Sequence, residues 1–255
     1  MNIVVCTKQT FDTEARITLE GGRIKEDGVQ YVLNPYDEYA VEEAIRLKEA
    51  HDGAVTVITA GPPRVEEAIR TALAMGADEG VVIGDERAWA DEYAVSRALA
   101  AAISARPYDI VLAGSQAVDD GAGQVAIRVA QLLGIAHIGV ITKLTVDGRH
   151  VVAERDAEGD TEIVEAELPV LVTAQQGLND PRYPSLLGIR KASKKPLTAV
   201  TLADLGLTEQ DVAPRRRTLE TFLPAQKGAG RILEGDTAAR VAELVKELRV
   251  TSKVL

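Results

Sequence analysis

A glycine-rich segment near the middle of the chain has the composition of a phosphate-binding loop. It runs from Gly114 to Gln124, contains three glycines, and precedes an apolar helical pattern. Small residues let a ligand approach the backbone closely, and free N–H groups at a helix N-terminus bind anions. Glycine-rich loops before helices also serve as plain turns, so this loop alone is compatible with a phosphate cradle or with a turn.

Two other short segments are candidates for the same site. The first apolar run ends at Cys6-Thr7-Lys8, and the small-residue turn Thr59-Ala60-Gly61-Pro62-Pro63 follows the second. In a parallel sheet, ligands bind beyond the carboxyl ends of the strands, which is where both segments would lie. Asn34-Pro35-Tyr36-Asp37 precedes the first helical pattern, where Asn34 or Asp37 would suit an N-cap and Pro35 an early helical position.

Residue types that form catalytic or metal centres are scattered in this sequence. His51, His137 and His150 stand alone, without a Ser, Cys or Asp partner at a recognisable spacing. Asp119-Asp120 lacks a nearby His, and such a pair more often caps a helix or meets solvent than binds a metal. The chain has no glycine-rich loop ending in Lys-Ser or Lys-Thr. We therefore predict no catalytic residues, no metal site, and a nucleotide that is held rather than hydrolysed.

The elements that must position these loops alternate between strand and helix. Four apolar runs have strand length: 3–6, 55–58, 81–83 and 110–112. Amphipathic helical patterns lie between them, at 36–50, 64–75 and 91–104. This alternation predicts an α/β fold with a doubly wound, mainly parallel sheet of flavodoxin-like architecture.

Two segments depart from this alternation. Residues 16–24 alternate around Gly21-Gly22, which predicts a small hairpin. From residue 138 to 173 the helical patterns stop, and hairpin signals around Asp147-Gly148 precede two further apolar runs at 163–164 and 170–172. We expect antiparallel strands at one edge of the sheet.

The last quarter of the chain has a different character. Residues 177–184 are rich in turn formers, and residues 191–217 carry the basic clusters Lys194-Lys195 and Arg215-Arg216-Arg217. Residues 237–248 form a last amphipathic pattern. We predict a nucleotide-binding domain at 1–190 and a C-terminal arm at 191–255 that packs on a partner.

Composition restricts the class of partner. The net charge is −10, from 39 acidic and 29 basic residues, which argues against nucleic acid or an anionic membrane. The single cysteine, Cys6, excludes an intrachain disulfide. No apolar run approaches the length of a membrane-spanning helix, and the N-terminus reads as a strand rather than a signal peptide. We expect a cytoplasmic protein without membrane insertion.

Five motifs in order resemble the beta (small) subunit of electron-transfer flavoproteins. They span residues 34–49, 69–78, 116–120, 158–173 (Glu158-Gly159-Asp160-x-Glu162, then Leu168-Pro169-Val170-Leu171-Val172-Thr173) and 178–183. The resemblance implies an electron carrier, not an enzyme in its own right, that works as a heterodimer with an alpha subunit. It also implies FAD held mainly by that alpha subunit and a structural AMP in this chain.

The resemblance assigns residues to two sites. The AMP pocket would comprise Cys6, Asn34, Pro35, Tyr36, Asp37, Ala60, Gly114, Ser115, Gln116, Ala117, Val118, Asp119, Asp120, Gly121, Ala122, Gly123, Gln124 and Val125. A loop that recognises acyl-CoA and related dehydrogenases would comprise Leu178, Asn179, Asp180, Pro181, Arg182 and Tyr183, with Leu178 as its exposed apolar anchor. Electrons from such dehydrogenases, as in fatty acid β-oxidation, would pass to a quinone-reducing or soluble acceptor.

The chain departs from this family in three places. Gly123-Gln124-Val125 replaces the Asn-Gln-Thr of many relatives, and Thr13 stands where several have a Tyr against the flavin. Electron-bifurcating relatives, which bind a second FAD in place of AMP, tend to have Asp-Gly-Asp-Thr where this chain has Asp119-Asp120-Gly121-Ala122, and this difference favours AMP. The bifurcating subunit stays an alternative, as does a homodimeric nucleotide-binding regulatory protein.

Overall fold

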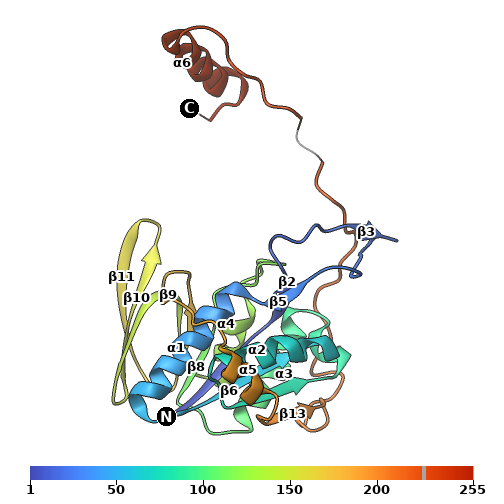
Figure 1. Cartoon of the computed structure of the whole chain (residues 1–255), viewed down its shortest axis with the longest axis vertical. Coiled ribbons are helices and arrows are strands. Elements are labelled where there is room, and N and C mark those ends of the chain that lie inside the picture. The colour runs from blue at the N-terminus through green and yellow to red at the C-terminus, as the bar shows by residue number, and fades with distance from the viewer. Residues whose placement is uncertain (226–227, 255) are drawn as a thin grey trace.

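A nine-stranded sheet forms the centre of the computed structural model, which describes residues 1–225 and 228–254 (Figure 1). Across the sheet the order is β11 (Asp160–Glu167), β10 (His150–Ala157), β9 (Ala136–Asp147), β12 (Val170–Ala174), β8 (Ile110–Gly114), β1 (Asn2–Cys6), β6 (Ala54–Ala60), β7 (Glu79–Ile83) and β13 (Leu197–Val200). The helices are α1 (Pro35–His51), α2 (Glu66–Met75), α3 (Glu92–Ser104), α4 (Val125–Leu133), α5 (Leu186–Ala192) and α6 (Thr237–Lys246).

The strand order reverses between β1 and β8. From β1 the chain proceeds to β6 and then β7 on one side, and it then crosses to β8 on the other side of β1, with all these neighbours parallel. The predicted doubly wound, mainly parallel sheet is confirmed. A reversal of this kind opens a crevice at the carboxyl ends of the two central strands, because the connections leave them in opposite directions.

The predicted antiparallel edge is also confirmed. β10 pairs antiparallel with both β9 and β11, whereas β12 pairs parallel with β9. A long strand, β9, therefore joins the parallel sheet to the edge hairpin. Near residues 16–24 the expected hairpin is formed by β3 (Leu19–Glu20) and β4 (Arg23–Ile24), and a second small ribbon pairs β2 (Gln9–Phe11) with β5 (Tyr31–Leu33).

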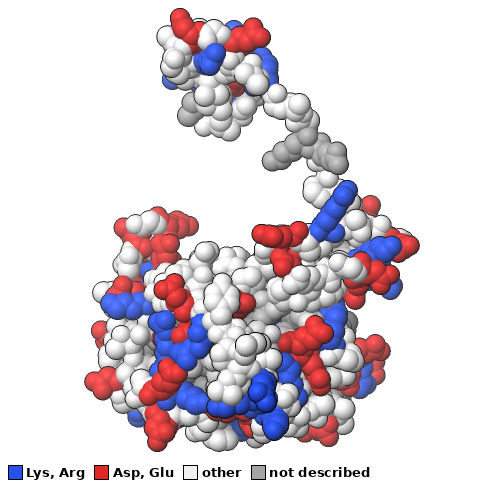
Figure 2. Space-filling model, in the orientation of Figure 1, with Lys and Arg blue, Asp and Glu red and all other residues white. Residues whose placement is uncertain are grey.

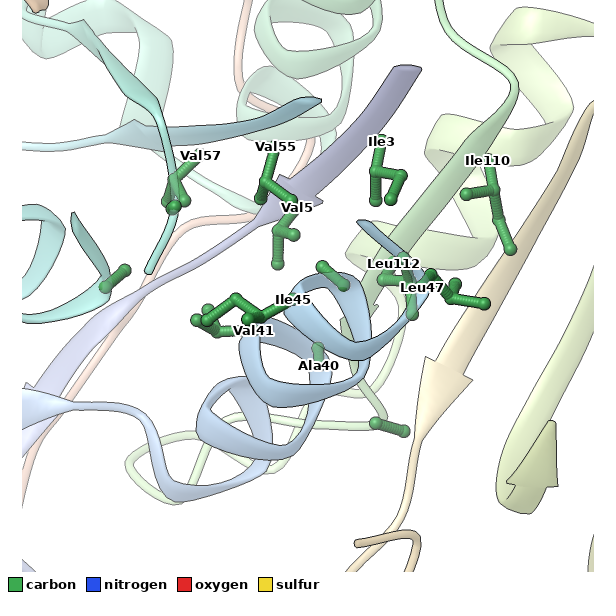
Figure 3. Close-up of a cluster of buried hydrophobic side chains, with 14 of the residues drawn as sticks. Ile3, Val5, Ala40, Val41, Ile45, Leu47, Val55, Val57, Ile110 and Leu112 are labelled. Carbon is green, nitrogen blue, oxygen red and sulfur yellow. The ribbon is translucent and has the colours of Figure 1, made fainter. Parts of the chain in front are cut away.

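Two aliphatic cores cover the two faces of the sheet. One face of β1, β6 and β8 packs against α1 and α2, whereas α3 and α4 cover the opposite face. In Figure 3, Val41 and Ile45 of α1 point toward Val5 and its neighbours on the strands. Because aromatic residues are scarce, these cores consist mainly of Ala, Val, Ile and Leu, as expected for a sheet buried on both faces.

The sheet extends into the segment that the sequence suggested as an arm. β13 lies beyond residue 190 and pairs in parallel with β7, and Leu202 and Val212 are buried in the second core. The predicted boundary at residue 190 therefore does not coincide with the edge of the sheet. Further along, α6 lies apart from the sheet in Figure 1 and has no buried residue. In the parts of the chain that are described, no helix has the length and hydrophobicity to cross a membrane.

Leu112→Ala tests how much this core contributes to the free energy of unfolding. Leu112 is fully buried on β8 beside α1. We expect Leu112→Ala to lower the free energy of unfolding by about 2–5 kcal/mol, because the substitution removes buried apolar surface and leaves a cavity. Urea denaturation measures the loss. Ile163→Ala, at an exposed position on β11, is the control and should change stability by less than about 0.5 kcal/mol.

Candidate functional site

A cavity of about 400 Å³ opens at the carboxyl ends of β1, β6 and β8, where the strand order reverses. Its floor is formed by Cys6, Ala60 and Ala113, and its walls come from the starts of α3 and α4. Volumes of this size are typical of sites for small ligands. The fold thus places this cavity at the position where doubly wound sheets bind ligands.

Asn34 and Asp37 hold the strand ends around this cavity together. The Asn34 side chain donates to the carbonyl oxygen of Gln116 (2.9 Å) and accepts from the N–H of Val118 (3.2 Å). The Asp37 carboxylate accepts from the N–H groups of Lys8 (2.7 Å) and Gly114 (2.9 Å). Asn34 occupies the N-cap position of α1 but makes no side-chain capping bond. Both side chains therefore join separate segments, rather than serving only as the helix caps that the sequence allowed.

The carboxylate of Asp37 also explains why residue 114 is a glycine. A Cβ atom at position 114 would lie 2.4 Å from Asp37 Oδ1 and 2.7 Å from Tyr36 Cβ. Burial raises the pKa of Asp37 to about 7, although the N–H groups that bond to it favour the ionised form. Asp37 is therefore a buried acid that titrates close to neutrality.

Lys8 forms the most concentrated group of charges at the cavity. Its ammonium lies 2.7 Å from Asp119 and 2.8 Å from Asp120. Burial lowers the pKa of Lys8, but its bonds to the two carboxylates raise it above the usual value. Asp120 also accepts from the N–H of Ala122 (2.9 Å). The two aspartates thus bind a lysine and order the loop.

The loop before α4 offers backbone donors. Gly121 and Gly123 adopt positive φ angles of 60° and 58°, which glycine adopts without strain. Gln124 makes no side-chain cap, so the first-turn N–H groups of α4 are left for a ligand or water. In the described chain, the buried hydroxyls of Thr7 and Thr10, which line the same cavity, have no hydrogen-bond partner. The open N–H groups of α4 fit a phosphate-bearing ligand.

An apolar slot adjoins these donors, between α3 and α4. Val95 and Leu99 line it from α3, and Val125, Ala126 and Val129 line it from α4. A slot with aliphatic walls suits a flat, weakly polar group such as a nucleobase. The cavity therefore combines features for a base and for a phosphate, which together fit a nucleotide.

Most residues assigned to the AMP pocket lie at this cavity, but four do not. Pro35, Tyr36, Val118 and Gly121 are absent from its lining, although Tyr36 contacts Gln116 through its hydroxyl at 3.3 Å. The sequence reasoning missed several lining residues. They are Thr10, Tyr31, Arg64, Trp89, Val95 and Leu99. Thr7 and Lys8 also line the cavity, as expected for residues that directly follow the first strand.

The one cysteine lies beneath the cavity. Burial and, to a smaller extent, the nearby charge of Asp37 raise the pKa of the Cys6 thiol to about 12. A thiol with this pKa stays protonated at neutral pH and is a poor nucleophile. Cys6 therefore contributes shape rather than reactivity to the site.

The segment predicted to dock onto dehydrogenases is held to α1. Arg182 contacts Glu42 (2.8 Å) and Glu49 (2.7 Å), and Asn179 donates to Glu43 (3.0 Å). Leu178, expected to be an exposed anchor, is instead half-buried and packs against the first core. The expectation was wrong for Leu178, because the turn that contains it folds back onto the helix.

Apolar side chains are exposed just after this segment. Tyr183 is 95% exposed and Leu186 is 83% exposed, and Leu187 and Ile189 are also exposed. Figure 2 shows Lys and Arg gathered near α5, whose flank carries the exposed Arg190, Lys191 and Lys194. An apolar group bordered by basic side chains is typical of a surface that binds another protein.

Comparison with known proteins identifies the family. Residues 21–205 match the family model described as "Electron transfer flavoprotein domain". The chain is 50% identical to the electron transfer flavoprotein subunit beta of Bacillus subtilis (strain 168), with all of both chains covered. The chain belongs to the beta-subunit family of electron transfer flavoproteins.

Other members of the family cover the chain almost completely. The electron transfer flavoprotein subunit beta of Syntrophomonas wolfei is 42% identical over all of this chain and 98% of its own length. The caffeyl-CoA reductase-Etf complex subunit CarD of Acetobacterium woodii is 38% identical over 98% of both chains. Membership confirms the predicted family and assigns the chain an electron-transfer role, as a carrier subunit of a flavoprotein.

Asp37→Asn tests the role of the buried acid. An amide cannot accept from both Lys8 and Gly114, so we expect the substitution to lower the free energy of unfolding at pH 5 by about 1–3 kcal/mol. The wild-type pKa of about 7 exceeds the ordinary value of 3.8, so the folded protein binds this proton more tightly than the unfolded chain does. The free energy of unfolding of the wild type should therefore fall as pH rises from about 4 to 7. The difference in this free energy between wild type and Asp37→Asn, called the gap below, should narrow by on the order of 1 kcal/mol per pH unit.

Urea denaturation at pH 5, 6 and 7 measures this gap. Asp160→Asn, at an exposed carboxylate on the edge hairpin, is the control and should leave the gap to wild type constant. A constant or widening gap for Asp37→Asn would show that Asp37 is already ionised in the folded protein at pH 5.

Proposed function

We propose that this chain is the beta subunit of a heterodimeric electron transfer flavoprotein and holds a structural AMP in the cavity beyond β1, β6 and β8. The observation that carries the proposal is that this cavity combines open backbone donors with an apolar slot, in a chain that matches beta subunits along its whole length. An alpha subunit would hold most of the FAD. When bound, FAD supplies the electron-transfer chemistry.

This chain's own residues would bind and position the nucleotide. The first-turn N–H groups of α4 would be the donors for its phosphate. Val95, Leu99 and Val129 would enclose the base. Asn34 and Asp37 are positioning residues, because they fix the loops that carry the donors. The chain would act in the cytoplasm and contribute no acid–base or nucleophilic group.

Two surfaces are suited to partners. One is the loop 178–183, which ends at the exposed Tyr183, with the neighbouring exposed Leu186 and Leu187. This surface would dock onto acyl-CoA and related dehydrogenases, as in fatty acid β-oxidation. In α6, Val241 and Leu244 are exposed, and this helix would pack on the alpha subunit. The electron acceptor would be quinone-reducing or soluble.

A bifurcating subunit that binds a second FAD in place of AMP is the other candidate. The 38% identity to a subunit named as part of a caffeyl-CoA reductase-Etf complex supports it. The loop sequence Asp119-Asp120-Gly121-Ala122 favours AMP. The two candidates differ in how many flavins each heterodimer contains.

Nucleotide analysis separates these candidates. We expect the chain, co-expressed with its alpha subunit, to form a yellow heterodimer that releases one FAD and one AMP on denaturation. Absorbance and chromatography of the released cofactors give the numbers. Two FAD and no AMP would establish the bifurcating alternative, and a colourless, nucleotide-free chain that does not bind the alpha subunit would contradict both.

Leu186→Ser tests the docking surface. The substitution removes an exposed apolar side chain that would be buried at the interface, where burial contributes about 1.5–3 kcal/mol. We expect electron transfer from the dehydrogenase to slow at least tenfold at limiting concentrations, with FAD content unchanged. Flavin reduction followed by stopped flow gives the rate. Ile163→Ser, at an exposed Ile on the edge strand β11, is the matched control, and equal rates in both variants would exclude this surface.

A further inference from the structure

The helix α5 exposes its large apolar side chains and packs its small residues inward. Its leucines and its isoleucine are exposed, whereas Ala192 is only 2% exposed. Gly188 lies so close to α2 that a Cβ atom there would be 2.4 Å from the carbonyl oxygen of Ala74. A helix of seven residues is unstable alone, and most helices are held by an apolar face packed on the core. Because this inward face buries little apolar surface, polar contacts must hold α5 in place.

The guanidinium group of Arg182 fixes the chain just before α5. Its Nε and Nη2 donate to Glu42 (2.8 and 3.1 Å), and its Nη1 and Nη2 donate to Glu49 (2.7 and 3.2 Å). The backbone N–H of Arg182 also donates to Glu42 (3.1 Å). Burial raises the pKa of Glu42, but its bonds to Arg182 and Arg46 lower that pKa below the usual value. Both carboxylates belong to α1, so the residue next to the exposed Tyr183 is fixed on that helix.

The two helices α2 and α5 cap each other's C-terminal ends. Arg70 of α2 donates to the carbonyl oxygens of Ala192 (2.7 Å) and Lys195 (3.1 Å). The ammonium of Lys195 donates in turn to the carbonyl oxygens of Leu73 (2.9 Å) and Ala77 (2.5 Å). The last carbonyl groups of a helix lack partners within it, and cationic side chains bind them favourably. α5 is therefore fixed at its C-terminal end as well as before its N-terminal end.

We propose that Arg182, Arg70 and Lys195 are positioning residues, which hold α5 in the orientation in which a dehydrogenase binds its exposed apolar side chains. This inference rests on the proposed docking function and adds the residues that fix the surface. A surface that is ordered before binding loses less conformational entropy on association. Loss of these contacts therefore weakens docking, whereas electron transfer within the docked complex keeps its rate. The expected effect is on KM and not on kcat.

Substitutions of opposite charge test the contact between Arg182 and α1. Arg182→Ala removes a positive charge and Glu49→Gln removes a negative one, yet both weaken the same contact. The heterodimer with its alpha subunit and FAD is titrated as electron acceptor of an acyl-CoA dehydrogenase and its acyl-CoA substrate. We expect the KM for the heterodimer to rise about tenfold for Arg182→Ala and about threefold for Glu49→Gln, with kcat within about twofold of wild type.

The double variant and the signs of the changes decide between positioning and charge. Arg182→Ala combined with Glu49→Gln should have the same KM as Arg182→Ala, because both substitutions remove the same contact. If the charge of the surface acted directly on the dehydrogenase, the two single variants would shift KM in opposite directions. Opposite shifts would overturn the proposal.

Gly188→Ala tests the position of α5 without changing any charge or exposed apolar side chain. Alanine is the better helix former, but its Cβ atom would collide with the carbonyl oxygen of Ala74, so α5 must move away from α2. We expect KM to rise at least about fivefold with FAD content unchanged. Gly84→Ala is the matched control, because a Cβ atom at this exposed position after β7 meets nothing within 4 Å, and its KM should equal that of wild type.

Hydrogen exchange shows whether α5 is released. The amide protons of α5 should exchange at least about tenfold faster in Arg182→Ala and in Arg70→Met than in wild type. Unchanged exchange in both variants, or faster exchange with an unchanged KM, would overturn the positioning role and leave the docking surface in place. A wild-type heterodimer whose flavin is not reduced by short- or medium-chain acyl-CoA dehydrogenases would instead contradict the proposed function.

Discussion

The carboxylate of Asp37 is the interaction on which the site depends. It belongs to α1, yet its two oxygens accept from the N–H of Lys8, the second residue after β1, and from the N–H of Gly114, the last residue of β8. These two strands are the ones between which the strand order reverses. Without a shared acceptor, two backbone N–H groups at that point would be buried without partners, which costs about 1–3 kcal/mol each. A single helical residue thus ties the ends of the two strands together.

Other features of the cavity follow from this constraint. Residue 114 must be glycine because the carboxylate occupies the space of a Cβ atom. The loop after β8 can then turn toward α1, where Asn34 holds it at Gln116 and Val118. That path brings Asp119 and Asp120 to Lys8, on the extension of β1. The geometry of the charged group therefore depends on a buried acid that bonds to the backbone of Lys8 and not to its ammonium.

The sequence predicted the architecture better than the site. Short aliphatic runs alternating with helical patterns defined the parallel sheet, because burial on both faces leaves a strong local signal. β13 was missed because Leu197–Val200 is a short edge strand inside a charged segment. The sequence also could not show that Asp37 bonds to two strand ends. An acid in the first turn of a helix has the same sequence pattern whether it caps the helix or bonds to neighbouring strands. Leu178 was misplaced because turn-forming neighbours suggest exposure, whereas contacts between Arg182 and α1 draw the segment inward.

Cys6 has a consequence for how this crevice can be observed. It is the only thiol in the chain, and it lies at the floor of the cavity with a pKa of about 12. The sulfur is buried and protonated, so a maleimide or iodoacetamide reagent has almost no thiolate to attack. Because Cys6 lines the cavity, the rate of alkylation reports how often the thiol there is both accessible and ionised. Mass spectrometry can follow the alkylation of this single cysteine without any introduced label.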